Sequence, residues 1–191
     1  MESINVTDLY NTYSSKLVIY LTRLAGKSEA EDLMHETFIK VFNSIDTFKG
    51  NSQISTWIYK IATNTAIDKL KSAGYRRLKY KTASIDYIEP LKSNFRHDTE
   101  EEFNIEYNFF KQEMNQCISD FIDRLPDNYR TIFLLREYEN FTIEEICEIM
   151  GVSFDNVKIR LHRARKKLQE LLMNNCKFYY DEYSKLCCDR K

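Results

Sequence analysis

Glycine and proline are scarce in this chain, whose 191 residues include four glycines and two prolines. Folds built from many short strands need these residues in their turns, so the scarcity argues against an all-β protein and favours long helices. Hydrophobic residues make up 43% of the chain, which is enough to build a core. We therefore expect an all-α fold.

Long apolar runs are also missing. None approaches the roughly 20 residues that cross a bilayer, and the first ten residues, MESINVTDLY, lack the basic start and apolar stretch of a signal peptide. No P-loop, nucleophile elbow or dinucleotide fingerprint is present. We expect no membrane insertion, a cytoplasmic location, no cofactor and no catalytic residues.

Cysteine is present, but not in a pattern that predicts a disulfide framework or a metal site. The five cysteines are Cys117, Cys147, Cys176, Cys187 and Cys188. Their number is odd, no C-x-x-C pair occurs, and two adjacent cysteines cannot easily bind one tetrahedral ion together. Free or redox-sensitive thiols are the favoured interpretation. A thiol- or metal-dependent enzyme that uses the last sixteen residues is a minor alternative.

A net charge of -1 conceals three segments of strong local charge. Residues 60–81 hold seven basic residues and one acidic residue, and residues 154–168 hold six and one. Between them, residues 85–106 hold seven acidic and two basic residues, include Pro90 and show no clear period. This composition is typical of a linker. The sequence therefore predicts two small helical domains joined by an acidic linker.

The N-terminal half has the periodicity of helices. Apolar residues recur at helical spacing over residues 30–42, ending at Phe42. A Gly-Asn-Ser turn follows, and then a second helix for which Ser55 or Thr56 is the expected N-cap and Gly74 the stop. On this second helix, Trp57, Ile58, Ile61, Ala62, Thr65 and Leu70 form the predicted apolar stripe. Lys60, Thr63, Asn64 and Lys71 are expected on its exposed side.

The C-terminal half contains a helix-turn-helix pattern. A helix is predicted after Pro126, and Thr142 and Glu145 then form a T-x-x-E capping box for a short helix that Gly151 ends. Ser153 is the expected cap of a longer basic helix. The apolar stripe of that helix is Val157, Leu161, Ala164, Leu168 and Leu171, at alternating spacings of four and three.

The second helix of such a pair enters the DNA major groove. Side chains off the apolar stripe are the candidates for contacting base edges: Asp155, Asn156, Lys158, Ile159, Arg160, His162 and Arg163. Arg165, Lys166 and Lys167 are better placed for phosphates. A solvated helix of an ordinary bundle is the simpler alternative, but six bases beside one acid, directly after a capped helix and a glycine turn, favour DNA binding.

Taken together, the two halves resemble a bacterial RNA polymerase sigma factor of the extracytoplasmic-function (ECF) subfamily of the sigma-70 family. The stretch AEDLMHETFIKVFNSIDTFKGNSQISTWIYKIATNTAIDKLKS resembles region 2, and LPDNYRTIFLLREYENFTIEEICEIMGVSFDNVKIRLHRARKKLQELL resembles region 4. The resemblance divides the chain into a region 2-like domain (1–82), an acidic linker (83–106), a region 4-like domain (107–175) and a Cys-rich tail (176–191). It implies a factor that binds core RNA polymerase and promoter DNA.

The resemblance also implies roles for particular residues. Region 4 reads the -35 element, which assigns that role to the basic helix. Region 2 binds the polymerase clamp, captures the -10 element and helps to melt it. Asp32, His35 and Glu36 match the clamp-binding helix, although the family usually has Gln at the position of His35. The -10 element is assigned to Asn51, Ser52, Gln53, Lys60, Thr63, Asn64, Arg76 and Arg77, with Asp common in the family where Asn51 stands.

Several alternatives stay open at this level. The linker is either a solvated tether or a segment that follows a basic channel of the polymerase. Trp57 and Tyr59 are aromatic candidates for the melted strand, although core packing is favoured for Trp57. Many members of the family are restrained by an anti-sigma factor, but no residue here identifies such a partner. A stand-alone helix-turn-helix regulator is the second hypothesis, and it leaves the region 2 resemblance unexplained.

Overall fold

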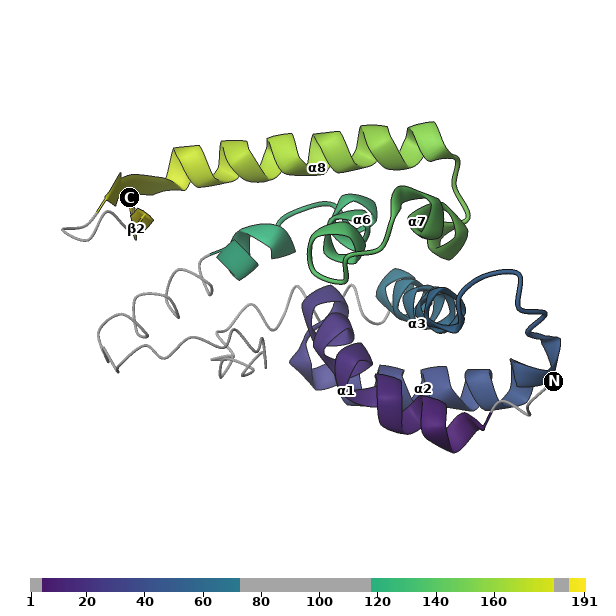
Figure 1. Cartoon of the computed structure of the whole chain (residues 1–191). Helices are drawn as coiled ribbons and strands as arrows, with labels where there is room; N and C mark the ends of the chain where they lie inside the picture. The colour runs from purple at the N-terminus through teal and green to yellow at the C-terminus, as the bar shows by residue number, and fades with distance from the viewer. Residues whose placement is uncertain (1–4, 73–117, 181–185) are drawn as a thin grey trace, which may run out of the picture.

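A computed structural model describes residues 5–72, 118–180 and 186–191 of the chain. The secondary structure of these residues is α-helical apart from a 3-10 turn and one short hairpin. Figure 1 shows α1, α2 and α3 grouped together, with α6, α7 and α8 stacked above them. The predicted all-α fold is confirmed, and the predicted linker lies outside the described residues.

The N-terminal group consists of α1 (Val6–Ala25), α2 (Lys27–Ser44), the 3-10 turn η1 (Ile45–Thr47) and α3 (Ile54–Lys71). Gly26 joins α1 to α2 with φ of 102°, a conformation that residues with a side chain rarely adopt, so glycine permits this abrupt turn. Leu21 of α1, Leu33 of α2 and Ile58 of α3 are fully buried where the three helices meet.

The N-cap predicted for α3 is wrong. Helix α3 begins at Ile54 after Gln53, so neither Ser55 nor Thr56 is its N-cap. Thr56 is fully buried, and its hydroxyl donates to a partner in the C-terminal group instead. Phe42, the last of the apolar residues that recur at helical spacing over residues 30–42, is 68% exposed because α1 and α3 cover only the opposite face of α2. The predicted stop at Gly74 lies outside the described residues.

The C-terminal group consists of helical residues 118–123, then α6 (Asp127–Glu137), α7 (Ile143–Met150) and α8 (Phe154–Asn175). Helix α6 begins directly after Pro126, as predicted. Helix α8 packs against α6 and α7 through Val157, Leu161, Ala164 and Leu168, all buried. The predicted apolar stripe of α8 is therefore confirmed over these four residues, whereas Leu171 is half-buried.

A two-stranded antiparallel hairpin follows α8 and was not predicted from the sequence. Strand β1 (Cys176–Tyr180) pairs with β2 (Leu186–Arg190), with Cys176 opposite Arg190 and Tyr180 opposite Leu186. The run of aromatic residues in β1 favours a strand locally, since large flat side chains suit a pleated surface.

The N-terminal and C-terminal groups pack on each other through two pairs of helices. Helix α1 contacts α6, and α3 contacts α7. In Figure 1, α3 and α7 lie side by side, whereas α8 is on the far side of α6 and α7 from the N-terminal group. This arrangement places the helix-turn-helix above α3 and directs α8 outward.

Candidate nucleic-acid and polymerase interfaces

The turn between α7 and α8 has the geometry that its sequence predicts. The Thr142 hydroxyl accepts the Glu145 N–H at 3.2 Å, and the Glu145 carboxylate accepts the Thr142 N–H at 2.8 Å. This reciprocal capping box starts α7. Gly151 ends it in the left-handed conformation, with φ of 63° and ψ of 35°, and donates its N–H to the Cys147 carbonyl. The two helices therefore meet at a fixed angle.

The exposed side of α8 presents most of the residues predicted to contact DNA. Exposed members are Asp155, Asn156, Lys158, Ile159, His162, Arg163, Lys166 and Lys167, while Arg160 is half-buried. The Lys158 ammonium lies 4.3 Å from the centre of the Phe154 ring, a cation–π contact that limits the freedom of this side chain. Ser153 precedes the helix as predicted, but its hydroxyl accepts from the Asn156 amide at 2.9 Å and makes no capping bond to the backbone.

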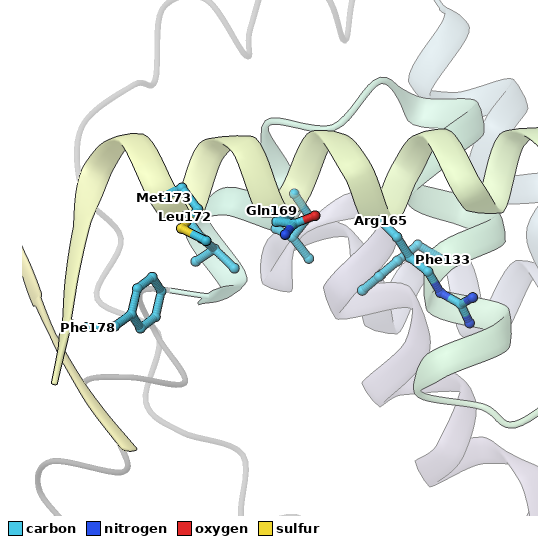
Figure 2. A pocket seen from close by; sticks show the side chains of 7 residues that line it. Phe133, Arg165, Gln169, Leu172, Met173 and Phe178 are labelled. Atoms are coloured by element: carbon cyan, nitrogen blue, oxygen red, sulfur yellow. The ribbon is translucent and has the colours of Figure 1, made fainter. Parts of the chain in front are cut away.

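Arg165, another of the predicted phosphate ligands, is also exposed, and it is paired with a residue of α6. Its guanidinium donates to the Glu137 carboxylate of α6 through Nε, at 3.1 Å, and through a second nitrogen. Figure 2 shows the Arg165 side chain extending from α8 towards α6 beside Phe133, at one end of an apolar hollow of about 270 Å³. Leu168, Gln169, Leu172, Met173 and Phe178 line the rest of the hollow. Arg165 therefore braces α8 against α6.

The residues predicted to contact the -10 element lie on α3 and on the loop before it. Asn51, Gln53 and Asn64 are exposed, and Ser52 and Lys60 are half-buried. Thr63 was expected on the exposed side of α3 but is fully buried, because Tyr20 of α1 covers it and the two hydroxyls form a hydrogen bond of 2.9 Å. Arg76 and Arg77 lie outside the described residues.

The two aromatic candidates on α3 are both engaged in packing. Tyr59 is 3% exposed and donates its hydroxyl to Glu139 at 2.7 Å, so it is not available to stack on a base in this arrangement. Burial and the neighbouring Glu139 raise the pKa of the Tyr59 phenol, which therefore stays protonated and acts as a donor. Trp57 is half-buried, with its ring centre 5.3 Å from that of Phe48. This contact agrees with core packing, the interpretation that the sequence favours for Trp57.

Helix α2 carries the predicted polymerase contacts on its outer side. Asp32, His35 and Glu36 are all exposed, and Glu36 forms an ion pair of 2.8 Å with Lys40 one turn later. Two large apolar side chains continue the same side of the helix: Ile39 is 62% exposed and Phe42 is 68% exposed. This apolar extension was not among the predicted contacts. The spacing of four and three from His35 to Ile39 and Phe42 was the signal for it.

The structure offers no support for a metal centre within its described residues. No group of three or more His, Cys, Asp or Glu side chains there is placed to hold an ion. Cys176 is buried, whereas Cys147 and Cys188 are partly exposed. Burial raises the pKa of the Cys147 thiol, which favours its unreactive protonated form. Among the helices described, none has the length and hydropathy that crossing a membrane requires.

A capped helix-turn-helix with a basic second helix, packed on a separate helical group, is the arrangement of a helix-turn-helix DNA-binding protein. Comparison with protein families agrees: residues 9–76 match the model of sigma-70 region 2, and residues 115–168 match that of sigma-70 region 4. The chain belongs to the ECF sigma factors of the sigma-70 family. Its function is promoter-specific initiation of transcription with RNA polymerase.

Similar proteins come from several bacteria. The chain is 33% identical over 168 residues to RNA polymerase sigma factor YlaC of Bacillus subtilis, a match that covers 87% of this chain and 91% of YlaC. It is also 33% identical to ECF RNA polymerase sigma factor SigW of the same species, with 86% and 87% covered. The ECF RNA polymerase sigma-E factor of Haemophilus influenzae is 31% identical, with 84% of each chain covered.

Solved structures share the fold at lower identity. The sigma factor RpoE from Bartonella quintana, in complex with the anti-sigma factor NepR, superposes with a TM-score of 0.65 at 20% identity, covering 87% of this chain and 96% of RpoE. CnrH, in complex with the cytosolic domain of CnrY, gives a TM-score of 0.60 at 16% identity, with 88% of each chain covered. The arrangement of helices in Figure 1 is thus one that sigma factors adopt.

Proposed function

We propose that the two helical groups divide the promoter between them. In this proposal, residues 107–175 form the domain that binds the -35 element as duplex. Residues 1–82 form the domain that binds core polymerase and the -10 element. Residues 83–106 link the two domains, and residues 176–191 form a separate tail. The family matches over residues 9–76 and 115–168 support this division.

The observation that carries the -35 assignment is the two-sided character of α8. One side is fixed by burial of Val157, Leu161 and Ala164, and the other presents the row of bases and amides to solvent. Lys158, Arg160 and Arg163 are the proposed base contacts, and Lys166 and Lys167 the phosphate contacts. Arg165 acts indirectly in this proposal, since Glu137 holds it.

The outer side of α2 is the proposed contact with core polymerase. Asp32, His35 and Glu36 supply polar groups, and Ile39 and Phe42 supply an apolar surface of the kind that is enriched at the centre of protein interfaces. Asn51, Ser52, Gln53, Lys60 and Asn64 are the proposed -10 contacts. Thr63 takes part only by holding α3 against Tyr20.

The protein acts in this proposal as a specificity subunit without catalysis of its own. Its relatives are initiation factors, and the polymerase supplies the chemistry. Its place of action is then the cytoplasm, where the polymerase and promoter are. RpoE from Bartonella quintana is in complex with the anti-sigma factor NepR, and we extend restraint by an anti-sigma factor to this chain.

In vitro transcription tests the proposal. Purified protein and core polymerase are mixed with a library of candidate promoters, and transcripts that start at defined positions are expected only when both are present. A variant in which Asp32, His35 and Glu36 are all changed to Ala should fold normally but give few transcripts. Absence of promoter-directed transcripts from every template, with a known sigma factor active in parallel, would contradict the proposed function.

A further inference from the structure

An isoleucine lies at the centre of the exposed side of α8. The buried stripe of this helix consists of Val157, Leu161, Ala164 and Leu168. Each residue turns an α-helix by about 100°, so Ile159 points about 170° away from the middle of that stripe. Its side chain is 48% exposed. Because the packed side of a recognition helix faces its own domain, Ile159 occupies the part of α8 that would enter a DNA groove deepest.

The neighbours of Ile159 on this side of the helix are polar or charged. Asp155 lies one turn before it and Arg163 one turn after it, and both are exposed. His162 and Lys166 continue the same side and are also exposed. A single apolar residue on a protein surface is ordinary. This one interrupts a row of side chains that can form hydrogen bonds with bases or phosphates, so its position calls for an apolar ligand within the same surface.

Two polar side chains flank Ile159 and are held by contacts within α8 and its turn. The Asn156 amide donates to the Ser153 hydroxyl at 2.9 Å on one flank. On the other flank, the Lys158 ammonium lies 4.3 Å from the centre of the Phe154 ring. Both contacts limit the freedom of these side chains near the start of the helix, where recognition helices meet base edges. Ile159 therefore lies between two polar groups whose positions are restrained.

The Ile159 side chain is itself restrained. Isoleucine in a helix has one strongly preferred rotamer at χ1, because its Cβ is branched. The backbone beneath it is fixed as well, since Val157 and Leu161 on either side in the sequence are buried against the rest of the C-terminal group. Ordering this side chain on binding costs less than ordering a long flexible one. The chain thus presents apolar methyl groups to solvent at a defined place.

The major groove offers one apolar group that suits such a side chain. Thymine carries a methyl group at C5, whereas the other groups on the groove edges of the four bases are hydrogen-bond donors and acceptors. Those polar groups would lose water against Ile159 without gaining a hydrogen bond, which is unfavourable. The thymine methyl loses no hydrogen bond and gains an apolar contact. A thymine is therefore the base that Ile159 favours.

We propose that Ile159 is a specificity-determining residue that recognises the C5-methyl group of a thymine in the -35 element. Lys158, Arg160 and Arg163 supply hydrogen bonds to neighbouring bases, and Ile159 selects the base pair between them by apolar contact. The preferred -35 sequence then contains a thymine, on either strand, at the base pair that faces Ile159. This inference rests on the proposed function and adds a base identity that the proposed function leaves open.

Deoxyuridine tests the proposal, because uracil pairs as thymine does but lacks the C5-methyl group. The full chain in complex with core polymerase first selects -35 sequences from a pool of random duplex DNA. Each thymine of a selected -35 sequence is then replaced in turn by uracil, and fluorescence anisotropy of the labelled duplex measures affinity. At one thymine, the replacement should weaken binding by about fourfold, the factor expected for one buried methyl group.

Variants of the chain show whether Ile159 reads that methyl group. Ile159→Ala should bind the thymine and uracil duplexes equally, whereas Ile159→Val keeps a branched apolar side chain and should keep most of the difference. Met173→Ala is the matched control, because it truncates a 58% exposed apolar residue about 21 Å further along the same helix. It should keep the full fourfold difference. Circular dichroism confirms that each variant is folded.

The outcomes distinguish this proposal from the proposed function. If the complex selects no duplex sequence, the proposed function fails and the role of Ile159 fails with it. If sequences are selected but no uracil replacement weakens binding, the role of Ile159 alone is overturned. It is also overturned if Ile159→Ala still distinguishes thymine from uracil. In that case the methyl group acts through another side chain or through the shape of the duplex.

Discussion

At the scale of single residues, the basic side chains of α8 have different surroundings that suit different tasks. Arg160 is half-buried near the start of the helix, where recognition helices meet base edges. Lys166 is exposed further along. Arg165, between Lys166 and the buried Ala164, pairs with Glu137 of the neighbouring helix. Charge in the sequence therefore does not translate uniformly into contact with DNA.

Arg160→Ala and Lys166→Ala should weaken -35 binding in distinguishable ways. Loss of Arg160 removes a base contact, so the cost of about 1–3 kcal/mol should depend on the base pair. Loss of Lys166 removes a phosphate contact, so affinity should fall by the same factor for all sequences. The slope of the logarithm of the binding constant against the logarithm of the salt concentration should become shallower by about one. Fluorescence anisotropy over a set of -35 variants and salt concentrations measures both. Identical behaviour of the two variants would refute the assignment.

At the scale of elements, the short helix α7 depends on its two ends. It spans only eight residues, too few to be stable alone, so its caps and its packing on α3 and α8 hold it in place. The capping box and the left-handed Gly151 are local features that the sequence contains in full. The position of α8 depends on α7, since Gly151 sets the angle between them.

Thr142→Ala should destabilise the C-terminal group by about 1 kcal/mol, because the N-cap hydroxyl that accepts the Glu145 N–H is lost. Thr142→Ser keeps a hydroxyl at the same place and serves as the control. Urea unfolding followed by circular dichroism measures the difference. Equal stability of the Ala and Ser variants would show that the capping bond contributes nothing.

The outer side of α2 makes a second prediction at this scale. Phe42→Ala should weaken binding to core polymerase by about ten- to a hundredfold, because burying an aromatic side chain contributes about 1.5–3 kcal/mol. Stability of the free protein should hardly change, since Phe42 is 68% exposed. Binding of labelled protein to core polymerase measures the effect, with Met173→Ala, a truncation of a 58% exposed apolar residue on α8, as the control. Unchanged affinity would remove Phe42 from the interface.

At the scale of the whole molecule, the half-buried Glu139 carboxyl is one of the contacts that join the two groups, because it accepts the Tyr59 hydroxyl of α3. Burial raises the pKa of Glu139, while the Tyr59 hydroxyl, Arg23 and Lys16 act in the opposite direction. The raised pKa means that the packed state binds a proton more tightly than the unfolded chain does. The contribution of this group to stability is therefore fully present below the unfolded pKa and is lost as pH rises through the raised pKa.

Glu139→Gln should remove that pH dependence. As pH rises through the raised pKa of Glu139, the free energy of unfolding of the wild type should fall relative to that of the Gln variant. Urea titrations at a series of pH values measure the two free energies of unfolding. Glu31→Gln, at an exposed position of α2, controls for loss of a surface carboxylate. If the free energy of unfolding of the wild type instead rose relative to that of the Gln variant with increasing pH, the upward shift in the pKa of Glu139 would be contradicted.

The fold and the site differ in how far they can be predicted from sequence. The capping box at Thr142, the turn at Gly151 and the stripe of α8 were predicted correctly, because each depends on residues within a turn or two of one another. The burial of Thr63 and Tyr59 was not predicted, because their hydrogen-bond partners lie far away in the chain. Tyr20 is the partner of Thr63, and Glu139 is the partner of Tyr59. The exposure of Phe42 was missed because periodicity does not say which side of α2 its neighbours leave open.

The sequence by itself determined the helices, their caps, the basic outer side of α8 and the membership of the sigma-70 family. These properties follow from short-range spacing, hydrogen bonds within a turn, and ordered motifs that survive as strings of residues. The tertiary structure alone decided that Glu137 holds Arg165, that Thr63 supports α1, and that α7 lies against α3. Such pairings depend on which surfaces meet when distant helices bury their apolar sides together, and a helical period specifies a surface without specifying its partner.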